Sequence, residues 1–176
     1  MRANLEEKQA EIPLTDRLIR KRITEAHDLY APWGETLWMD PHISSLLKIL
    51  ELKIAASAKA MHDFGILAAC RRCDREEGGS CCGAGIENKY TPLLLLINLL
   101  FGKTLPKERL WPSSCFFLSE VGCCLKVRQV LCVNYLCLKL QKLLPSDELA
   151  SLQQITGEEM DAGFILYEAV KKFIGN

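Results

Sequence analysis

Apolar residues recur at helical spacing near the start of the chain. Thr15 provides an N-cap for a helix that runs to about Tyr30. Segment 31–34 contains Pro32 and Gly34, which predict a break after this helix. The residues expected to face inward are Leu18, Ile23, Ala26 and Leu29.

Two further predicted helix starts share one signal, a capping side chain that is followed directly by proline. Asp40 before Pro41 predicts a long helix that reaches about Ala69, directly before the first cysteine. Thr91 before Pro92 predicts a short apolar helix that ends at Gly102. The inward face of the long helix is expected to contain Ile43, Leu46, Leu47, Leu50, Ile54, Ala58 and Met61.

The last third of the chain is also helical by pattern. The apolar stretch 127–144 predicts one helix, which Pro145 ends before a short helix capped by Ser146. The residues from Thr156 to Glu159 match a capping box and predict a separate last helix ending at Gly175. Because no segment alternates strictly between apolar and polar residues, the expected fold class is mainly α.

The length of 176 residues suits one domain with one buried core. We expect a single helical domain, 1–176, wrapped around a cysteine-rich metal-binding loop region. Its parts are N-terminal helices over 12–69, a cysteine-rich core over 70–137 and C-terminal helices over 138–176.

Charge and hydropathy narrow the function classes. The chain has 22 basic residues (Lys and Arg) and 22 acidic residues (Asp and Glu), so its formal net charge is zero. A neutral chain has no general electrostatic attraction to nucleic acid or to an anionic membrane. The polar first residues contain Glu6, Glu7 and Glu11, unlike a secretory signal. The aliphatic run Leu93–Leu96 is far shorter than the roughly 20 residues that span a bilayer. We therefore expect a cytoplasmic protein without nucleic-acid or membrane partners.

The nine cysteines form the strongest signal in the sequence. All of them lie between Cys70 and Cys137, whereas cysteines that act only as small apolar residues would be scattered through the core. A reducing compartment keeps thiols free, so clustered cysteines favour metal binding or redox chemistry over disulfides. Inert buried thiols and a disulfide framework are the weaker alternatives. The Cys70–Cys73 pair has no βαβ setting of a thioredoxin-like site.

The surroundings of these cysteines suit a negatively charged centre. Cys81 and Cys82 lie in a glycine-rich stretch, 78–85, where backbone N–H groups can approach a ligand closely. Four thiolates around Zn²⁺ or a [4Fe–4S]²⁺ core leave a charge of about −2. The cations nearby in sequence are Arg71, Arg72, Arg75, Lys126 and Arg128.

These motifs resemble a known family. The order of Cys70-Arg-Arg-Cys73, Cys81-Cys82, Cys115-Phe-Phe-Leu118 and Cys123-x4-Arg128-x3-Cys132 is similar to the YkgJ-type "CxxCxxCC" family of zinc- or iron-chelating proteins. The resemblance covers residues 70–137 and implies metal chelation; for relatives that modify protein lysines it implies an iron–sulfur cluster. Gln129 stands where the family usually has proline, which favours a helix continuous through Cys132.

The resemblance implies a ligand set that leaves out Cys124. The metal ligands it predicts are Cys70, Cys73, Cys81, Cys82, Cys115, Cys123, Cys132 and Cys137. They could fill two four-coordinate sites or one cluster. Arg128 is expected to bind the cofactor by donating to sulfur or to nearby carbonyls.

The ligand types favour an iron–sulfur cluster over zinc. Zinc sites often combine two CxxC pairs or mix Cys with His, but this chain has one CxxC, and His62 is expected at the edge of the core. The favoured function is a module that binds metal for storage, sensing or electron transfer. The alternatives are a structural zinc protein and a cluster-dependent enzyme acting on a protein or small molecule. The expected partner is a metal ion or cluster, and a protein partner stays open.

Overall fold

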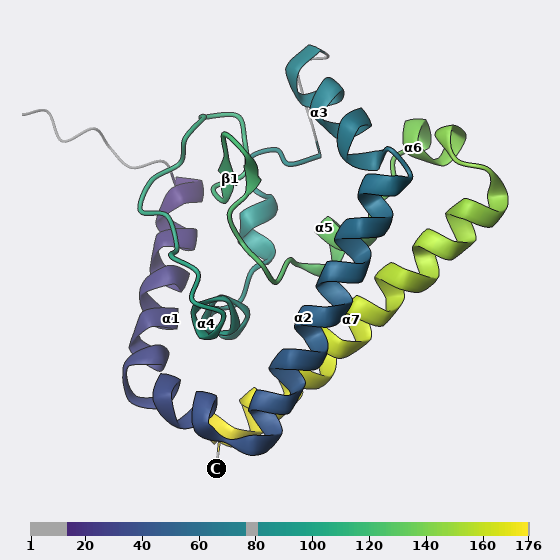
Figure 1. The fold of residues 1–176 in the computed structure, drawn as a ribbon. Coiled ribbons are helices and arrows are strands. Elements are labelled where there is room, and N and C mark those ends of the chain that lie inside the picture. The colour runs from purple at the N-terminus through teal and green to yellow at the C-terminus, as the bar shows by residue number, and fades with distance from the viewer. Residues whose placement is uncertain (1–13, 77–80, 176) are drawn as a thin grey trace, which may run out of the picture.

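The protein is mainly helical, as the sequence predicts (Figure 1). The structure is a computed structural model that describes residues 14–76 and 81–175. Its longer helices are α1 (Leu14–Met39), α2 (Pro41–Asp63), α3 (Ile66–Glu76), α4 (Pro92–Leu100) and α7 (Ser146–Gly175). The shorter elements are the 3-10 helix η1 (Ile86–Lys89), strands β1 (Leu118–Ser119) and β2 (Gly122–Cys123), and helices α5 (Val130–Asn134) and α6 (Leu138–Leu143).

Helices α1 and α2 form a V whose corner is Asp40 (Figure 1). The Asp40 carboxylate accepts a hydrogen bond from the Ile43 N–H at 2.8 Å, and Pro41 opens α2, so this predicted start is confirmed. Helix α4 and the β1–β2 hairpin fill the V, while α7 runs along α2 (Figure 1). The rings of Trp33 and Phe173 meet edge to face at 6.2 Å and fix the end of α7 to α1 near this corner.

The predicted break at residues 31–34 is wrong, because α1 continues through Pro32. A proline inside a helix removes one hydrogen bond and costs about 3 kcal/mol. Tertiary packing compensates: Leu37, beyond the proline, is fully buried in the core, and Trp33 packs beside it. Leu18 is also turned outward at 42% exposure, whereas its neighbour Ile19 is buried. Thr15 lies inside α1, and its side chain is outside the described part of the chain.

The predicted long helix from Pro41 to Ala69 is in fact two helices. Helix α2 ends at Asp63, and Gly65 has a φ of +72°, a left-handed conformation that glycine adopts without strain. Helix α3 then leaves in a new direction and carries the first two cysteines (Figure 1). Ala58 and His62, expected inward or at the core edge, are exposed. The short helix predicted after Thr91 is confirmed as α4.

The capping box predicted at residues 156–159 is wrong, because α7 is one continuous helix of 30 residues. The hydroxyl of Thr156 donates backwards, to the Leu152 carbonyl at 2.9 Å, instead of capping a new helix. Continuous burial against α2 explains the uninterrupted helix despite Gly157. The buried residues of α7 share one stripe: Leu152, Thr156, Glu159, Ala162, Leu166 and Val170.

The single helix predicted over 127–144 is also wrong. Extended backbone at Gln129, Tyr135 and Cys137 divides it into α5 and α6. The Gln129 side chain accepts from the Leu131 N–H at 2.6 Å and so starts α5 at this point, instead of continuing a helix through it. Strands β1 and β2, of two residues each, form an antiparallel hairpin in which Leu118 pairs with Cys123. The sequence pattern did not predict this small sheet.

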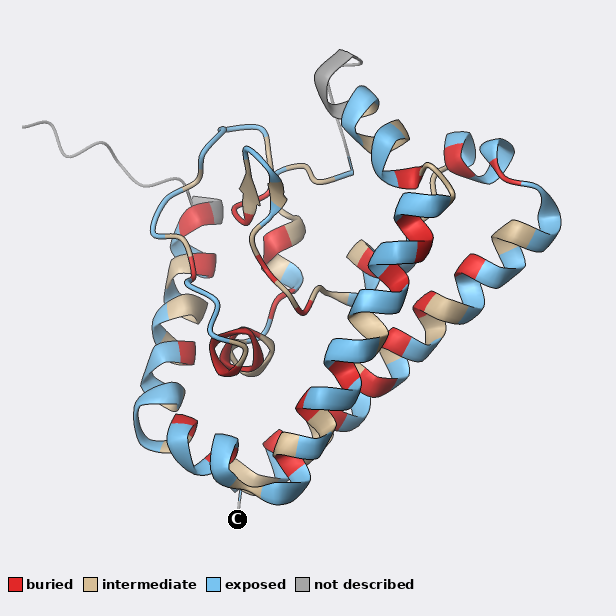
Figure 2. Ribbon diagram, viewed as in Figure 1, coloured by how far each residue is buried: buried red, intermediate tan, exposed pale blue. Residues whose placement is uncertain are grey.

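Buried apolar side chains form three clusters that divide the molecule. One lies at the α1–α2 corner and includes Leu50 and Leu166. A second lies between α1, α4 and the cysteine-bearing loops around Phe116 and Phe117, and a third joins α2, α3, α6 and α7 around Leu152. In Figure 2 the buried faces of α2 and α7 point toward each other. Within residues 14–76 and 81–175, no helix is both long and apolar enough to cross a bilayer.

Candidate metal centre

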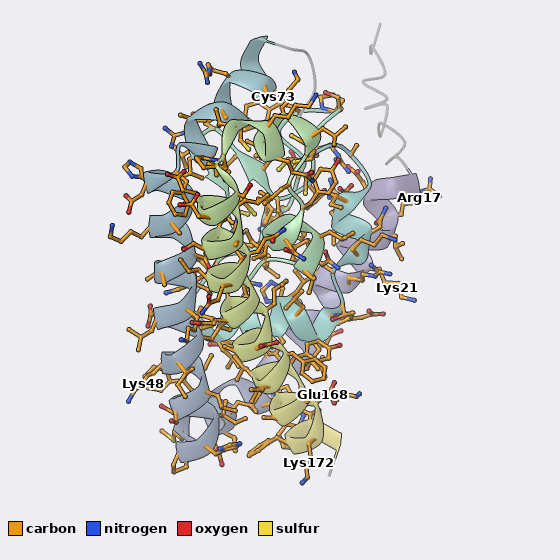
Figure 3. All side chains as sticks on the ribbon, turned by 90° about the vertical axis from the view of Figure 1, so that its right-hand side faces the viewer. Arg17, Lys21, Lys48, Cys73, Glu168 and Lys172 are labelled. Atoms are coloured by element: carbon orange, nitrogen blue, oxygen red, sulfur yellow. The ribbon has the colours of Figure 1, made fainter. Side chains whose placement is uncertain are left out.

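The predicted ligands come from several separate segments. Cys70 and Cys73 lie one turn apart on α3, and Cys73 lies at the end of the molecule opposite Glu168 and Lys172 (Figure 3). Cys81 and Cys82 precede η1, and Cys115 precedes the hairpin. Strand β2 carries Cys123, α5 carries Cys132, and Cys137 is the N-cap residue of α6. All nine cysteines are free thiols. The glycine-rich residues 78–80 and the Arg75 side chain lie outside the described residues.

Four thiols form a first set, which we call the α3–α6 thiol group: Cys70, Cys73, Cys81 and Cys137. Burial raises the pKa of Cys70, and negative charge on the other three members raises it further. Cys70 and Cys137 also pack against the apolar cluster around Leu152. Cys137 therefore lies near Cys70 although the two are far apart in the sequence.

The other four predicted ligands form a second set, the hairpin thiol group: Cys82, Cys115, Cys123 and Cys132. Burial raises the pKa of Cys115 to about 12, with smaller contributions from Glu87, Cys123 and Cys132. Cys123 is exposed as a residue, yet desolvation by the surrounding protein still raises the pKa of its thiol. Cys82 and Cys115 pack in the cluster around Phe116 and Phe117.

The two groups meet at adjacent residues, Cys81 and Cys82. A hydrogen bond between the two side chains lowers the pKa of Cys81 to about 6 and raises that of Cys82. Cys81 also acts on Cys132, so the groups are coupled across this junction.

Cys124 differs from the eight predicted ligands. It lies partly buried against the Phe117 cluster, and its backbone N–H donates to the Phe117 carbonyl at 2.9 Å. Burial raises the pKa of its thiol to about 11, and the neighbouring thiol that contributes is Cys123. It shares this apolar cluster with Cys82 and Cys115.

A buried ion cluster, which the sequence analysis did not identify, joins the loops of the hairpin thiol group. Arg109 is 7% exposed and pairs with Asp16 of α1, at 2.7 Å, and with the fully buried Glu87 of η1. It also donates to the Ser114 carbonyl, next to Cys115. Burial opposes the charge of Arg109, but its bonds to Asp16 and Glu87 still raise its pKa. The Cys115 N–H donates to the Cys82 carbonyl at 2.6 Å between the joined loops.

Asn98 of α4 fixes the segment after the hairpin. Its fully buried side chain accepts from the N–H groups of Lys126 and Val127, both at 2.9 Å. It also donates to the carbonyls of Leu94 and Val127, at 3.0 and 2.9 Å. This amide therefore makes four bonds, which use both of its donors and its carbonyl oxygen twice.

Tyr90 fixes the start of α5. Its buried hydroxyl accepts from the Gln129 N–H at 3.1 Å and lies 3.9 Å from the Cys132 sulfur. Burial and the neighbouring Cys132 and Cys123 raise the pKa of Tyr90, so the phenol remains a donor toward sulfur. The Gln129 N–H that makes this contact is a group that proline would lack.

Arg128 lies beside the hairpin thiol group, although it precedes α5 instead of sharing a helical face with Cys132. It is half-buried, and its charge lowers the pKa of Cys123 and of Cys132 against the larger effect of burial. Lys126 instead pairs with Glu51 and lies 4.9 Å from the centre of the Phe101 ring. Arg71 and Arg72 are exposed on α3.

Within the part of the chain that the structure describes, no three Cys, His, Asp or Glu side chains converge closely enough to hold a metal ion. His62 is exposed beside Asp63, with an Nδ1 to Oδ1 distance of 3.3 Å. The donor types fit a zinc or iron–sulfur centre, and metal binding would have to draw the thiols of each group together.

Comparison with known proteins finds no relative of this chain. No family model, no curated protein and no solved structure matches the chain. The resemblance to the YkgJ-type family therefore stays a prediction.

Proposed function

We propose that this protein is a metal-binding module whose eight predicted cysteine ligands hold two neighbouring four-thiolate centres. One centre uses the α3–α6 thiol group and the other uses the hairpin thiol group. Iron–sulfur clusters are the favoured occupants, zinc is the alternative, and the cytoplasm is the proposed compartment. The module would store, sense or transfer metal or electrons.

One observation carries this proposal. Cys70 and Cys137 pack in the apolar cluster around Leu152, whereas Cys82 and Cys115 pack in the cluster around Phe116 and Phe117, where the Cys115 N–H donates to the Cys82 carbonyl at 2.6 Å. Spacing along the chain cannot produce this division, since Cys137 joins the earliest cysteines and Cys82 joins the later ones. A charge of about −2 at each centre calls for nearby cations and hydrogen-bond donors, and the Arg128 guanidinium and the Tyr90 hydroxyl lie beside the hairpin thiol group.

Anaerobic purification with an absorption spectrum and analyses of iron, acid-labile sulfide and zinc tests the proposal. A broad absorption band in the blue, with iron and sulfide in equal amounts, supports iron–sulfur clusters. A colourless protein with stoichiometric zinc supports the zinc alternative. If the protein is folded and its thiols are reduced, yet it binds neither iron nor zinc after reconstitution, the proposal is contradicted. Cys124→Ser is the matched control and should keep the full metal content.

A cluster-dependent enzyme is the second candidate. It would use the same centres to modify a protein or a small molecule. The observation in its favour is a cavity that shares Arg128 with the hairpin thiol group.

A further inference from the structure

A cavity of about 230 Å³ lies between α2, α4, α5 and α7. Its walls are mostly apolar and include Leu50, Leu94, Val130, Val133 and Phe164. Val130 and Val133 face it from α5, whereas Cys132 on the same helix faces Tyr90. The cavity therefore adjoins the hairpin thiol group without containing a cysteine.

A buried carboxyl group lines this apolar cavity. Glu159 is only 4% exposed, and its Oε2 accepts no hydrogen bond from the described residues. A buried polar atom left without a partner is costly, so native proteins nearly always satisfy such atoms. The preceding residue, Glu158, behaves differently: it is exposed and pairs with Lys53 at 2.7 Å.

Two cationic side chains also line the cavity. Arg128 is half-buried, and its guanidinium lies 3.9 Å from the Met61 sulfur; among the described residues no carboxylate forms an ion pair with it. Lys89 is exposed at the rim, next to Thr91, whose hydroxyl lies 3.3 Å from that of Tyr167. The cavity lining thus combines a carboxylate at Glu159, cations at Arg128 and Lys89, and apolar side chains.

We propose that this cavity binds a small zwitterion, a free α-amino acid with an apolar side chain. Its ammonium group would meet Glu159, its carboxylate would meet Arg128 and Lys89, and its side chain would pack on the valines of α5. A simple cation would be repelled by the two basic residues, and a simple anion by Glu159. The volume is that of several water molecules at about 30 Å³ each and below the range for drug-sized ligands, about 300–1,000 Å³, which suits a ligand of this size.

Calorimetric titration of the intact, metal-loaded protein with three probes tests this proposal. The probes are leucine, leucine methyl ester, which lacks the carboxylate, and N-acetyl-leucine, which lacks the ammonium. Leucine should bind at least about tenfold more tightly than either derivative, since each charged contact is lost in one of them. Equal binding of the ester, equal binding of the acetyl derivative, or no binding because water alone solvates Glu159 would each overturn the proposal.

Two neighbouring variants separate the cavity from general stability. Glu159→Gln should weaken leucine binding at least about tenfold, whereas Glu158→Gln should leave it unchanged. Both variants should keep the metal content and a melting temperature no lower than that of the wild type, so a loss of binding would not reflect unfolding or a lost metal centre. Wild-type affinity in Glu159→Gln would overturn the proposal, whatever the outcome of the metal analyses.

Discussion

At the scale of single residues, a few buried polar side chains elsewhere in the fold hold the cysteines in place. Asn98 bonds the backbone after the hairpin, Tyr90 bonds the start of α5, and Arg109 joins the two loops that carry Cys82 and Cys115. Each of these groups satisfies backbone N–H or carbonyl groups that the irregular loops leave unpaired. These bonds position the segments that carry Cys82, Cys115 and Cys132.

Arg128 is the cation whose removal should affect the metal centre most directly. Arg128→Met keeps much of the side-chain bulk and removes the charge beside Cys123 and Cys132. We expect metal affinity to fall about 10–100-fold, measured by competition with a chelator, and the spectrum or reduction potential to shift. Arg72→Met, on the exposed face of α3, is the control and should behave as wild type. Unchanged affinity, spectrum and potential in Arg128→Met would remove Arg128 from the site.

At the scale of elements, helix starts could be predicted from sequence more reliably than helix ends. Asp40-Pro41 and Thr91-Pro92 begin helices as expected, since a capping side chain and a proline act locally. The breaks expected at Pro32 and Thr156 do not occur, because long-range packing on the core outweighs local preference there. The break at Tyr135 could not be predicted, because no glycine or proline lies there.

Gly157 distinguishes a continuous α7 from the two helices predicted by the capping box. A methyl group at this position meets no atom within 4 Å, and the residue lies inside α7. Gly157→Ala should therefore raise the free energy of unfolding by about 0.5–1 kcal/mol, measured by urea denaturation.

Gly65→Ala is the matched control for that measurement. The site is equally open, but its φ of +72° disfavours alanine, so this variant should lower stability by about 1 kcal/mol. An equal effect of both substitutions would contradict the helix boundaries described above.

At the scale of the whole molecule, the topology brings cysteines that are distant in the sequence into the same apolar clusters, Cys70 with Cys137 and Cys82 with Cys115. Clustering between Cys70 and Cys137 and the family-like motif were sufficient to single out eight candidate ligands and to leave out Cys124. How those eight divide could not be predicted, because it depends on where α3 and α6 pack and on the joining of the two loops by Arg109. The ion cluster itself is formed by Asp16, Glu87 and Arg109, which lie far apart in the sequence and match no motif.

Removing Arg109 should damage both the fold and the metal centre. Arg109→Met leaves Asp16 and Glu87 buried without their cation, which should cost about 3–5 kcal/mol of unfolding free energy in a chemical denaturation experiment. The hairpin thiol group should then bind metal more weakly, since one link between the loops of Cys82 and Cys115 is lost and only their backbone hydrogen bonds remain. Lys59→Met breaks an exposed pair with Asp63 and should cost less than about 0.5 kcal/mol. Adding Asp16→Asn and Glu87→Gln to Arg109→Met should recover part of the loss; no recovery would mean that the charges are not its cause.

Serine variants in each thiol group decide between two centres and one shared cluster. Cys137→Ser removes a ligand from the α3–α6 thiol group, and Cys123→Ser removes one from the hairpin thiol group. If each group holds its own centre, either variant should keep about half of the metal, and the double variant should lose all of it.

Because structural metal binding supplies about 10 kcal/mol or more of apparent folding energy, each variant should also melt at a lower temperature. Amide hydrogen exchange should then quicken mainly in α3 and α6 for Cys137→Ser, and mainly in the hairpin and α5 for Cys123→Ser. Complete metal loss in either single variant would show that one centre spans both groups, with Cys81 and Cys82 at its middle.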